Sequence, residues 1–381
     1  MKVFQIVSSV YPINIGGVEV HVYNLSKELV KRGFSVEILT KNGVYAIKNE
    51  ELVLIEKCRY FKILKYLLLK DYDLVHIHNW GAMPLGLVKN EIALLICKLR
   101  KKKIVITPHG FPEIISSTAK KSIKARIFLI FSKFIFTLID KFVCVHPQQE
   151  ETLNSNFSIS KDKMVVIPNG ISELAFEQHN PMNFVNKYKL NGKRILCYIG
   201  RLAPNKRLSD AIEVMSKLKR KDNISLVIIG PDGGDMANLL NLIDKYNLKN
   251  VILLGELNEK EKYQALSAAD IFLSTSSSEA FGISTCEAMA QGVPVISANN
   301  IGAKYLLNEG KYGSLYEIGD TNSLLEKILY FLENPKKAKR MGEKGRKRTT
   351  KFKWSKIVGE VEKVYKELLE KNKRMIKNGG F

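Results

Sequence analysis

Short apolar runs recur along the chain, and each is followed by a loop and then by apolar residues at helical spacing. Such runs hold few polar residues, which is typical of strands buried on both faces of a parallel sheet. Because strands and helices alternate through both halves, we expect an α/β protein with two parallel sheets. The runs lie at residues 3–7, 74–78, 104–107, 142–145 and 165–167 in the first half and at 195–199, 227–229, 251–254, 271–273 and 293–297 in the second.

The length of 381 residues allows two domains of ordinary size, each with its own core. We expect a first domain over residues 1–180 and a second over 181–356. A polar stretch between residues 171 and 193, which contains Pro181, is the expected linker. Hydrophobic residues make up 45% of the chain and charged residues 26%, a soluble globular profile, and we find neither an internal repeat nor a low-complexity segment.

Glu279 and Glu287 stand eight residues apart around the start of a predicted helix. We expect Glu279 in a strand-to-helix turn and Glu287 about two turns inside the helix, at the edge where open α/β sheets bind ligands. Gly282 lets a ligand approach the backbone, and the free N–H groups of a helix start favour phosphate. Two carboxylates around an anion site suit a ligand with hydroxyls and phosphate, such as a nucleotide sugar. A capped helix with two solvated acids is the alternative.

A second cluster, Gly200, Arg201 and Lys206, follows the apolar run 195–199. Arg201 offers a fixed bidentate fork for phosphate oxygens, and Lys206 is a compact point charge. Opposite a diphosphate, the two cations would stabilise the negative charge that grows on a departing group. They could instead be ordinary surface cations of a lysine-rich protein.

Gly16 and Gly17 open the first predicted helix, over residues 20–32, after the first strand. Two glycines at a helix start suit close approach to phosphate, although such a pair alone is more often plain turn chemistry. The chain contains neither the dinucleotide fingerprint G-x-G-x-x-G nor the Walker sequence G-x-x-x-x-G-K-[ST] at this or any other position.

Together these motifs resemble the family 4 glycosyltransferases, which have the GT-B fold of two Rossmann-like, doubly wound domains that face each other across a cleft. The resemblance runs nearly end to end, in the same order and the same strand–loop–helix context. It rests on residues 16–19, 107–110, 167–170, 200–201 with 206, 230–234, and the pair Glu279 and Glu287.

The resemblance implies a retaining transferase that moves a hexose-type sugar from a nucleotide sugar to an acceptor hydroxyl. It implies that the first domain binds the acceptor, that the second binds the donor, and that a closing helix over residues 357–381 packs back on the first. The implied catalytic residues are His109, Arg201, Lys206 and Glu279. The implied donor-binding residues are Gly16, Gly17, Gly200, Arg201, Lys206, Asp232, Glu279, Phe281, Gly282, Ile283 and Glu287.

In such enzymes Arg201 and Lys206 would bind the donor diphosphate, Glu279 the donor sugar and Glu287 the ribose, with His109 near the reacting sugar. We identify no nucleophile for a double displacement. We therefore hypothesise that the acceptor attacks from the face that the diphosphate leaves, and that a diphosphate oxygen takes the proton. Domain closure would exclude water during this step.

Neither a cofactor nor a metal is expected, because the cations and helix starts would neutralise the diphosphate. The Asp-x-Asp signature of the other glycosyltransferase fold occurs only at residues 71–73, ahead of a strand, where it predicts an exposed turn. His21, His76 and His78 could line the acceptor side, but no carboxylate stands at ligand spacing with them, which argues against a metal there. Five scattered cysteines without C-x-x-C spacing predict reduced thiols in a cytosolic protein.

Two basic runs dominate the net charge of +22: residues 120–141 carry +5 and residues 336–353 carry +9. The first run, Lys120 to Lys141, includes an aromatic-rich helical segment that is too short for a bilayer, which takes about 20 apolar residues. It is either a helix on an anionic membrane surface or a core helix with solvated lysines. We expect a cytoplasmic protein, peripheral on the inner face of the cell membrane if this helix contacts lipid. Nucleic acid is disfavoured as a partner because the second run holds few aromatics.

The basic, aromatic-rich run from Lys120 to Lys141 favours a lipid-linked or glycan acceptor, as in cell-envelope polysaccharide or glycolipid synthesis. UDP-, GDP- and ADP-sugars all stay open as donors. Two other classes stay open as well: a nucleotide-sugar 2-epimerase of the same fold, and a non-catalytic protein that binds a nucleotide sugar or a polyanion.

Overall fold

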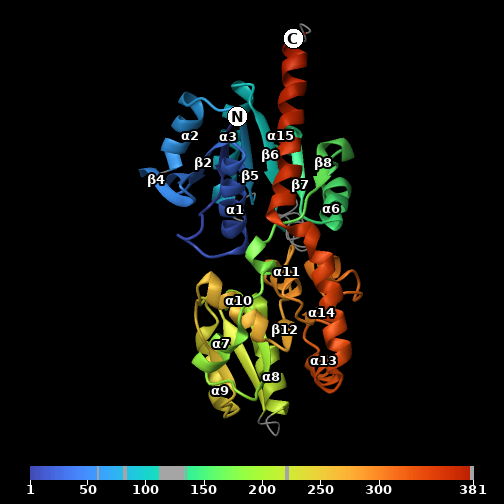
Figure 1. Cartoon of the computed structure of the whole chain (residues 1–381). Helices are drawn as coiled ribbons and strands as arrows, with labels where there is room; N and C mark the ends of the chain where they lie inside the picture. Colours follow the sequence, from blue (N-terminus) through green and yellow to red (C-terminus); the bar gives the residue numbers. More distant parts are fainter. Residues whose placement is uncertain (58–59, 80–83, 111–132, 134, 219–222, 378–381) are drawn as a thin grey trace. The chain divides into compact units, whose positions relative to one another are not determined.

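The computed structural model describes residues 1–57, 60–79, 84–110, 133, 135–218 and 223–377, and it divides into two compact units (Figure 1). Unit 1 comprises Met1–Gly170 and Trp354–Phe381, and unit 2 comprises Ile171–Lys353. Each unit is built around a sheet with helices on both faces, so the α/β prediction is confirmed. Most of the predicted helix within residues 120–141 lies outside the described residues.

In the described part of unit 1, eight strands form one sheet in the order β4-β3-β2-β1-β5-β6-β7-β8. The pairs from β2 through β1 to β8 are parallel, while β3 and β4 add an antiparallel edge. The strand order reverses at β1, which lies between β2 and β5. The strands are β1 (Lys2–Ile6), β2 (Ser35–Thr40), β3 (Gly43–Lys48), β4 (Glu51–Lys57), β5 (Leu74–His78), β6 (Lys103–Thr107), β7 (Lys141–Cys144) and β8 (Met164–Val166).

Alternate strand residues of unit 1 face two apolar clusters, one on each side of the sheet. Phe4 contributes to the side that α2, α3 and α6 cover, and Val3 to the side that α1 and α15 cover. The last helix, α15, joins α1 through an ion pair between Arg32 and Glu362 at 2.8 Å. The helices are α1 (Gly17–Lys31), α2 (Tyr60–Leu69), α3 (Pro84–Leu99), α6 (Pro147–Phe157), η1 (Lys161–Lys163) and α15 (Trp354–Lys377).

In the described part of unit 2, six parallel strands lie in the order β11-β10-β9-β12-β13-β14. Counted from β9, this is the Rossmann order 3-2-1-4-5-6, and it reverses between β9 and β12. The strands are β9 (Arg194–Ile199), β10 (Ile224–Ile229), β11 (Val251–Leu253), β12 (Ile271–Ser274), β13 (Val295–Ala298) and β14 (Ser314–Tyr316).

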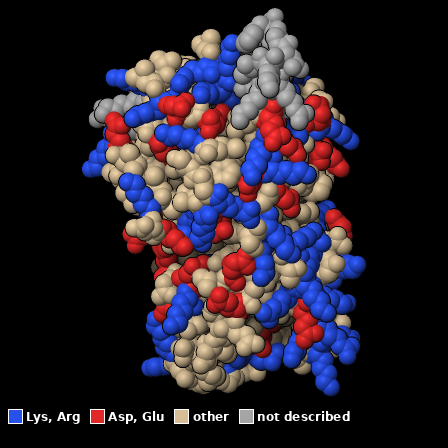
Figure 2. Space-filling model, turned by 45° about the horizontal axis from the view of Figure 1, so that its top comes forward, with Lys and Arg blue, Asp and Glu red and all other residues tan. Residues whose placement is uncertain are grey.

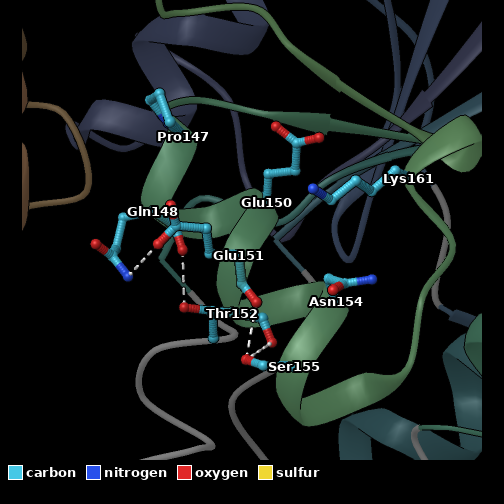
Figure 3. A pocket seen from close by; sticks show the side chains of 8 residues that line it. All are labelled: Pro147, Gln148, Glu150, Glu151, Thr152, Asn154, Ser155 and Lys161. Atoms are coloured by element: carbon cyan, nitrogen blue, oxygen red, sulfur yellow. Dashed lines mark hydrogen bonds between the residues drawn. The ribbon is translucent and has the colours of Figure 1, made fainter.

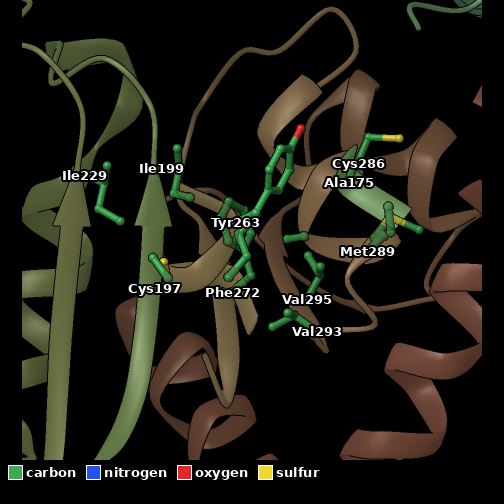
Figure 4. Close-up of a cluster of buried hydrophobic side chains, with 14 of the residues drawn as sticks. Ala175, Cys197, Ile199, Ile229, Tyr263, Phe272, Cys286, Met289, Val293 and Val295 are labelled. Atoms are coloured by element: carbon green, nitrogen blue, oxygen red, sulfur yellow. The ribbon is translucent and has the colours of Figure 1, made fainter. Parts of the chain in front are cut away.

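The helices of unit 2 bury both faces of its sheet. Figure 4 shows one of the two clusters, in which Cys197 and Ile199 of β9 share an apolar layer with Tyr263 and Phe272. The helices are η2 (Glu173–Phe176), α7 (Pro181–Lys187), η3 (Pro204–Lys206), α8 (Leu208–Lys217), α9 (Met236–Lys245), α10 (Glu259–Ala268), α11 (Ile283–Ala290), α12 (Ile301–Leu307), α13 (Thr321–Glu333), α14 (Pro335–Thr349) and η4 (Thr350–Phe352).

The stretch expected as a linker, residues 171–193, is instead a folded part of unit 2. It forms η2 and α7, and four of its apolar side chains are buried in the unit 2 core: Ile171, Ala175, Phe184 and Leu190. The chain therefore leaves unit 1 after Gly170, not near residue 180. The polar majority of this stretch concealed the apolar positions that anchor it.

The second basic run forms α14 and the turn after it, with most of its cations exposed. Figure 2 shows Lys and Arg side chains spread over the surface, with acidic side chains among them. Among the described residues, no helix has both the length and the apolar character needed to cross a membrane.

Candidate functional site

The loops after β9 and β12 leave the unit 2 sheet on either side of the point where the strand order reverses, which is where open α/β sheets bind ligands. Hydrogen bonds tie the two loops together. The Thr275 hydroxyl donates to the Lys206 carbonyl at 2.6 Å, and the Ser277 N–H donates to the Asn205 carbonyl at 3.0 Å. The side chains that these loops carry are therefore held at fixed positions relative to each other.

Lys206 and Glu279 meet across this pair of loops and form an ion pair. Their side chains are 17% and 26% exposed, so a ligand can reach both. The Gly302 N–H at the start of α12 donates to the Glu279 carbonyl at 3.0 Å, which holds the acidic loop from its other side. The ammonium group and the carboxylate thus face each other where both are accessible to solvent.

Arg201 lies in the same β9 loop, exposed to solvent. It makes no ion pair with any residue that the structure describes. Its aliphatic stem packs on Gly233, where an added Cβ would lie 2.6 Å from the Arg201 Cγ. The guanidinium is thus available to an anion at the reversal point.

Helix α11 begins at the end of the acidic loop with its first N–H groups uncapped by side chains of the described residues. Gly282 precedes it with φ 87°, a left-handed conformation that favours glycine. Phe281 is buried against Phe352, and Ile283 packs on the same core. Phe281, predicted as donor-binding, can therefore offer a ligand only its backbone, whereas Ile283, predicted likewise, is half-buried.

Glu287 lies one turn inside α11, not two, because the helix begins at Ile283. Its side chain is only 9% exposed. Lys262 Nζ at 2.7 Å and the Tyr263 hydroxyl at 3.0 Å both bond to its Oε1. This arrangement leaves Oε2 for a ligand hydroxyl. No motif in the sequence pointed to Lys262 and Tyr263, which are ordinary residues of α10.

Asp232 lies in the loop after β10, where its carboxylate accepts from the Gly234 N–H at 2.8 Å and the Met236 N–H at 3.2 Å. These backbone bonds lower the pKa of Asp232. The carboxylate thus shapes its own loop. At Gly230, with φ 143°, an added Cβ would lie 2.0 Å from the Gly200 carbonyl oxygen, so the loops after β9 and β10 require glycine to approach this closely.

In unit 1, three histidines gather at the corresponding reversal point, between β1 and β5. His21 comes from α1, which begins at the predicted Gly16–Gly17 turn, His78 ends β5, and His109 follows β6. His109 has φ 49°, an uncommon conformation outside glycine. Its Nε2 lies 3.2 Å from the His78 Nδ1.

Burial keeps these imidazoles neutral near pH 7. It lowers the pKa of His21 to about 3, and it lowers those of His78 and His109 well below their ordinary value, with help from neighbouring histidines. His76 lies behind them with both nitrogens in use, bonded to the Tyr365 hydroxyl at 2.6 Å and to the Thr107 hydroxyl at 2.8 Å. The sequence did not point to Tyr365, which α15 brings to β5.

A separate pocket lies on α6 and η1 of unit 1 and contains none of the predicted site residues (Figure 3). Its side chains largely bond to one another and to the helix backbone. Gln148, for example, donates to Glu151 at 3.0 Å, and the Thr152 hydroxyl donates to the Gln148 carbonyl at 2.8 Å. Among the described residues, the polar groups of this pocket do not converge on one point as they would around a ligand.

Comparison with known proteins identifies the family. A family model described as glycosyl transferases group 1 matches residues 182–348, and one described as glycosyltransferase family 4 matches residues 15–173. An uncharacterized glycosyltransferase of Methanocaldococcus jannaschii is 30% identical over 379 residues, which cover 97% of this chain and 99% of that protein. The chain belongs to the family 4 glycosyltransferases. The resemblance predicted from the motifs is thereby confirmed.

Two further comparisons, one with a sequence and one with a solved structure, cover nearly the whole of this glycosyltransferase. The N-acetyl-α-D-glucosaminyl L-malate synthase of Bacillus anthracis is 25% identical over 95% of this chain and 97% of its own. The structure of Anabaena HepE in complex with UDP-glucose superposes with a TM-score of 0.77 at 18% identity, over 96% of this chain and 100% of that one. The latter likeness shows the GT-B fold, as predicted.

Proposed function

We propose that this glycosyltransferase is a retaining, metal-independent hexosyltransferase that binds its nucleotide-sugar donor at the reversal point of unit 2. One observation carries the proposal: two adjacent loops bring Arg201, Lys206, Glu279 and the open start of α11 together. Cations and free N–H groups suit a diphosphate, while a carboxylate beside them suits sugar hydroxyls. Family membership makes a nucleotide sugar the ligand class that fits both.

Each side chain has a distinct role in the proposed reaction. Arg201 and Lys206 bind the diphosphate, Glu279 accepts from hydroxyls of the donor sugar, and Glu287 accepts from the ribose. The acceptor oxygen bonds to the anomeric carbon on the face from which the diphosphate leaves, as the bond from carbon to the diphosphate oxygen breaks. That diphosphate oxygen takes the acceptor proton. The two cations stabilise the charge on the departing group, which is why the proposal needs no metal.

A UDP-sugar is the donor that we test first, because HepE was crystallised with UDP-glucose. GDP- and ADP-sugars are the alternatives. His109 is assigned to the reacting sugar by resemblance, and its neutral imidazole suits a hydrogen bond to a sugar hydroxyl.

We further propose a lipid-linked or glycan acceptor and peripheral association with an anionic membrane surface. The exposed cations of α14 support this part: they project Lys336, Lys337, Lys339, Arg340 and Lys344 into solvent beside a single acidic residue, Glu343. Such a surface attracts anionic headgroups by about 1 kcal/mol for each cation near the membrane. Sedimentation with vesicles of neutral and of anionic lipid tests it, and equal binding to both would contradict it.

The donor site is tested by calorimetric titration with UDP-, GDP- and ADP-sugars, each with and without EDTA. We expect one nucleotide class to bind, unaffected by EDTA, and Glu287→Gln to weaken it. An EDTA-sensitive donor would contradict metal independence, and binding of none would contradict the donor site. Incubating the donor without acceptor separates a transferase from an epimerase, because only an epimerase would isomerise the sugar.

A further inference from the structure

The three histidines of unit 1 have the mutual spacing of ligands on one metal ion. One ligand nitrogen from each of His21, His78 and His109 lies within 4.8 Å of the others. Their ring centroids are 4.8 Å apart for His21 and His109, and 5.5 Å apart for His78 with either of the other two. Three imidazoles on a tetrahedral zinc ion, bound at about 2.0–2.1 Å, would have ring centres roughly 5.2 Å apart.

Two of the nitrogens also lie at a separation close to that of ligands on one ion. The 3.2 Å between His78 Nδ1 and His109 Nε2 is close to the ~3.4 Å between two nitrogens on one zinc ion. His21 Nδ1 is buried without a hydrogen-bond partner among the described residues. His78 Nδ1 and His109 Nε2 share a hydrogen bond, so the nitrogen that donates it must pass its proton to the other nitrogen of its ring before both can bind one ion.

A second layer of groups holds the cluster in place. His76 packs against His78 with ring centroids 4.0 Å apart, and its two nitrogens are hydrogen-bonded to Tyr365 and Thr107. His76 is therefore a wall of the site and not a ligand. The Trp354 ring packs on His21 from another side, at 5.2 Å. Half-buried His109 provides the side from which an ion can enter.

We propose that His21, His78 and His109 form a site for one divalent transition-metal ion of the zinc class, with a fourth position open to water or a ligand. Three nitrogen ligands exclude the hard cations Mg²⁺ and Ca²⁺, which take oxygen. The sequence argued against a metal here because no carboxylate stands at ligand spacing. In the folded protein, three segments that are distant in sequence supply three imidazole ligands, so a carboxylate is not needed.

A metal ion bound at this site would affect catalysis, and this consequence rests on the proposed function. His109 cannot hydrogen-bond a donor sugar while its nitrogen is bound to a metal. Zn²⁺ is therefore a reversible inhibitor of transfer, relieved by EDTA, even though the reaction itself uses no metal.

Binding is tested first, on untagged protein without donor or acceptor, by titration with Co²⁺ and calorimetry with Zn²⁺. We expect one equivalent of either ion and the visible absorption of four-coordinate cobalt, without the near-ultraviolet band of a thiolate ligand. Replacing a ligand should weaken binding by roughly 100-fold or more, since even changes in the second layer of a metal site cost 10–100-fold. His21→Gln and His109→Gln remove one ligand each, and His179→Gln, at a half-buried position in unit 2, is the matched control.

Far-ultraviolet circular dichroism checks that each variant is folded. If the buried His21→Gln variant does not fold, half-buried His109→Gln decides the matter. Absence of stoichiometric binding, equal affinity in His109→Gln, or a thiolate band would overturn the site. These titrations need no turnover, so an inactive protein that binds Co²⁺ would refute the proposed function alone. An active protein that binds no metal would refute the site alone.

Discussion

Lys206→Ala separates the two roles that the structure allows for this lysine. Lys206 forms an ion pair with Glu279, and the two side chains are 17% and 26% exposed. The lysine could serve only to neutralise that carboxylate, or it could bind the donor diphosphate as proposed. The two roles differ in what the substitution does to stability and to turnover.

The expected loss of stability is small. Exposed ion pairs contribute about 0–1 kcal/mol and removal of one partner of a buried pair costs about 3–5 kcal/mol, so this half-buried pair should cost roughly 1–2 kcal/mol. In a unit of about 180 residues each kcal/mol lowers Tm by about 2–4 °C, which gives a fall of roughly 2–8 °C. The expected loss of turnover is larger. Removal of one preorganised group that stabilises developing charge typically costs about 10²–10³-fold in kcat.

The assay measures nucleotide diphosphate released in the presence of acceptor, at a temperature well below the Tm of the variant. Lys217→Ala is the matched control, because it removes a lysine from a surface ion pair with Glu213 on α8. Adding Glu279→Gln to Lys206→Ala should recover most of the lost Tm without recovering turnover. Turnover of Lys206→Ala within about threefold of wild type would show that our reasoning about the diphosphate is wrong.

Three further predictions concern stability. The pKa of His21 falls from 6.5 to about 3 on folding, so the unfolded chain binds more protons than the folded protein between pH 3 and pH 6.5. The free energy of unfolding should therefore decrease as the pH falls through this range, by up to about 1.4 kcal/mol per pH unit for this residue. Urea midpoints that do not fall from pH 7 to pH 5 would contradict this prediction. Gly230→Ala should lower Tm by several degrees because its Cβ would meet a backbone oxygen at 2.0 Å. Gly192→Ala, also at positive φ but in open space, should lower the free energy of unfolding by only about 1 kcal/mol. Equal Tm values for the two variants would refute the steric argument. Tyr365→Phe should cost about 1–3 kcal/mol by leaving a buried His76 nitrogen without its partner, measured by chemical denaturation, and an unchanged midpoint would mean that this hydrogen bond adds nothing.

The central strands of both sheets could be predicted because parallel strands buried on two faces appear as continuous apolar runs. The edge of unit 1 could not. Strand β4 contains an apolar run at residues 52–55 but is largely exposed, so it lacks the burial on which the strand predictions rest. The β2–β3–β4 edge was missed for this reason, just as the buried positions of residues 171–193 were hidden by their polar neighbours.

The approach of Lys206 to Glu279 followed from one rule, that the carboxyl ends of neighbouring parallel strands share an edge. The rule places loops but not the residues behind them. Lys262 and Tyr263 reach Glu287 from a helix more than twenty residues away, and Tyr365 reaches His76 from 289 residues away. Contacts of this kind depend on helix packing, for which a single sequence holds no local signal.

The division of unit 1 between the two ends of the sequence has a consequence for synthesis of the chain. Unit 1 is started first but lacks α15 until the whole of unit 2 has been made, roughly 10–40 s later at common rates of translation. During that interval α1 and its side of the sheet lack the cover that Val358, Val361 and Tyr365 later provide. Unit 2, which is continuous in sequence, can fold on emergence. The nascent chain therefore carries a complete unit 2 and an incomplete unit 1 with exposed apolar surface, and this is the stage at which a chaperone would bind it.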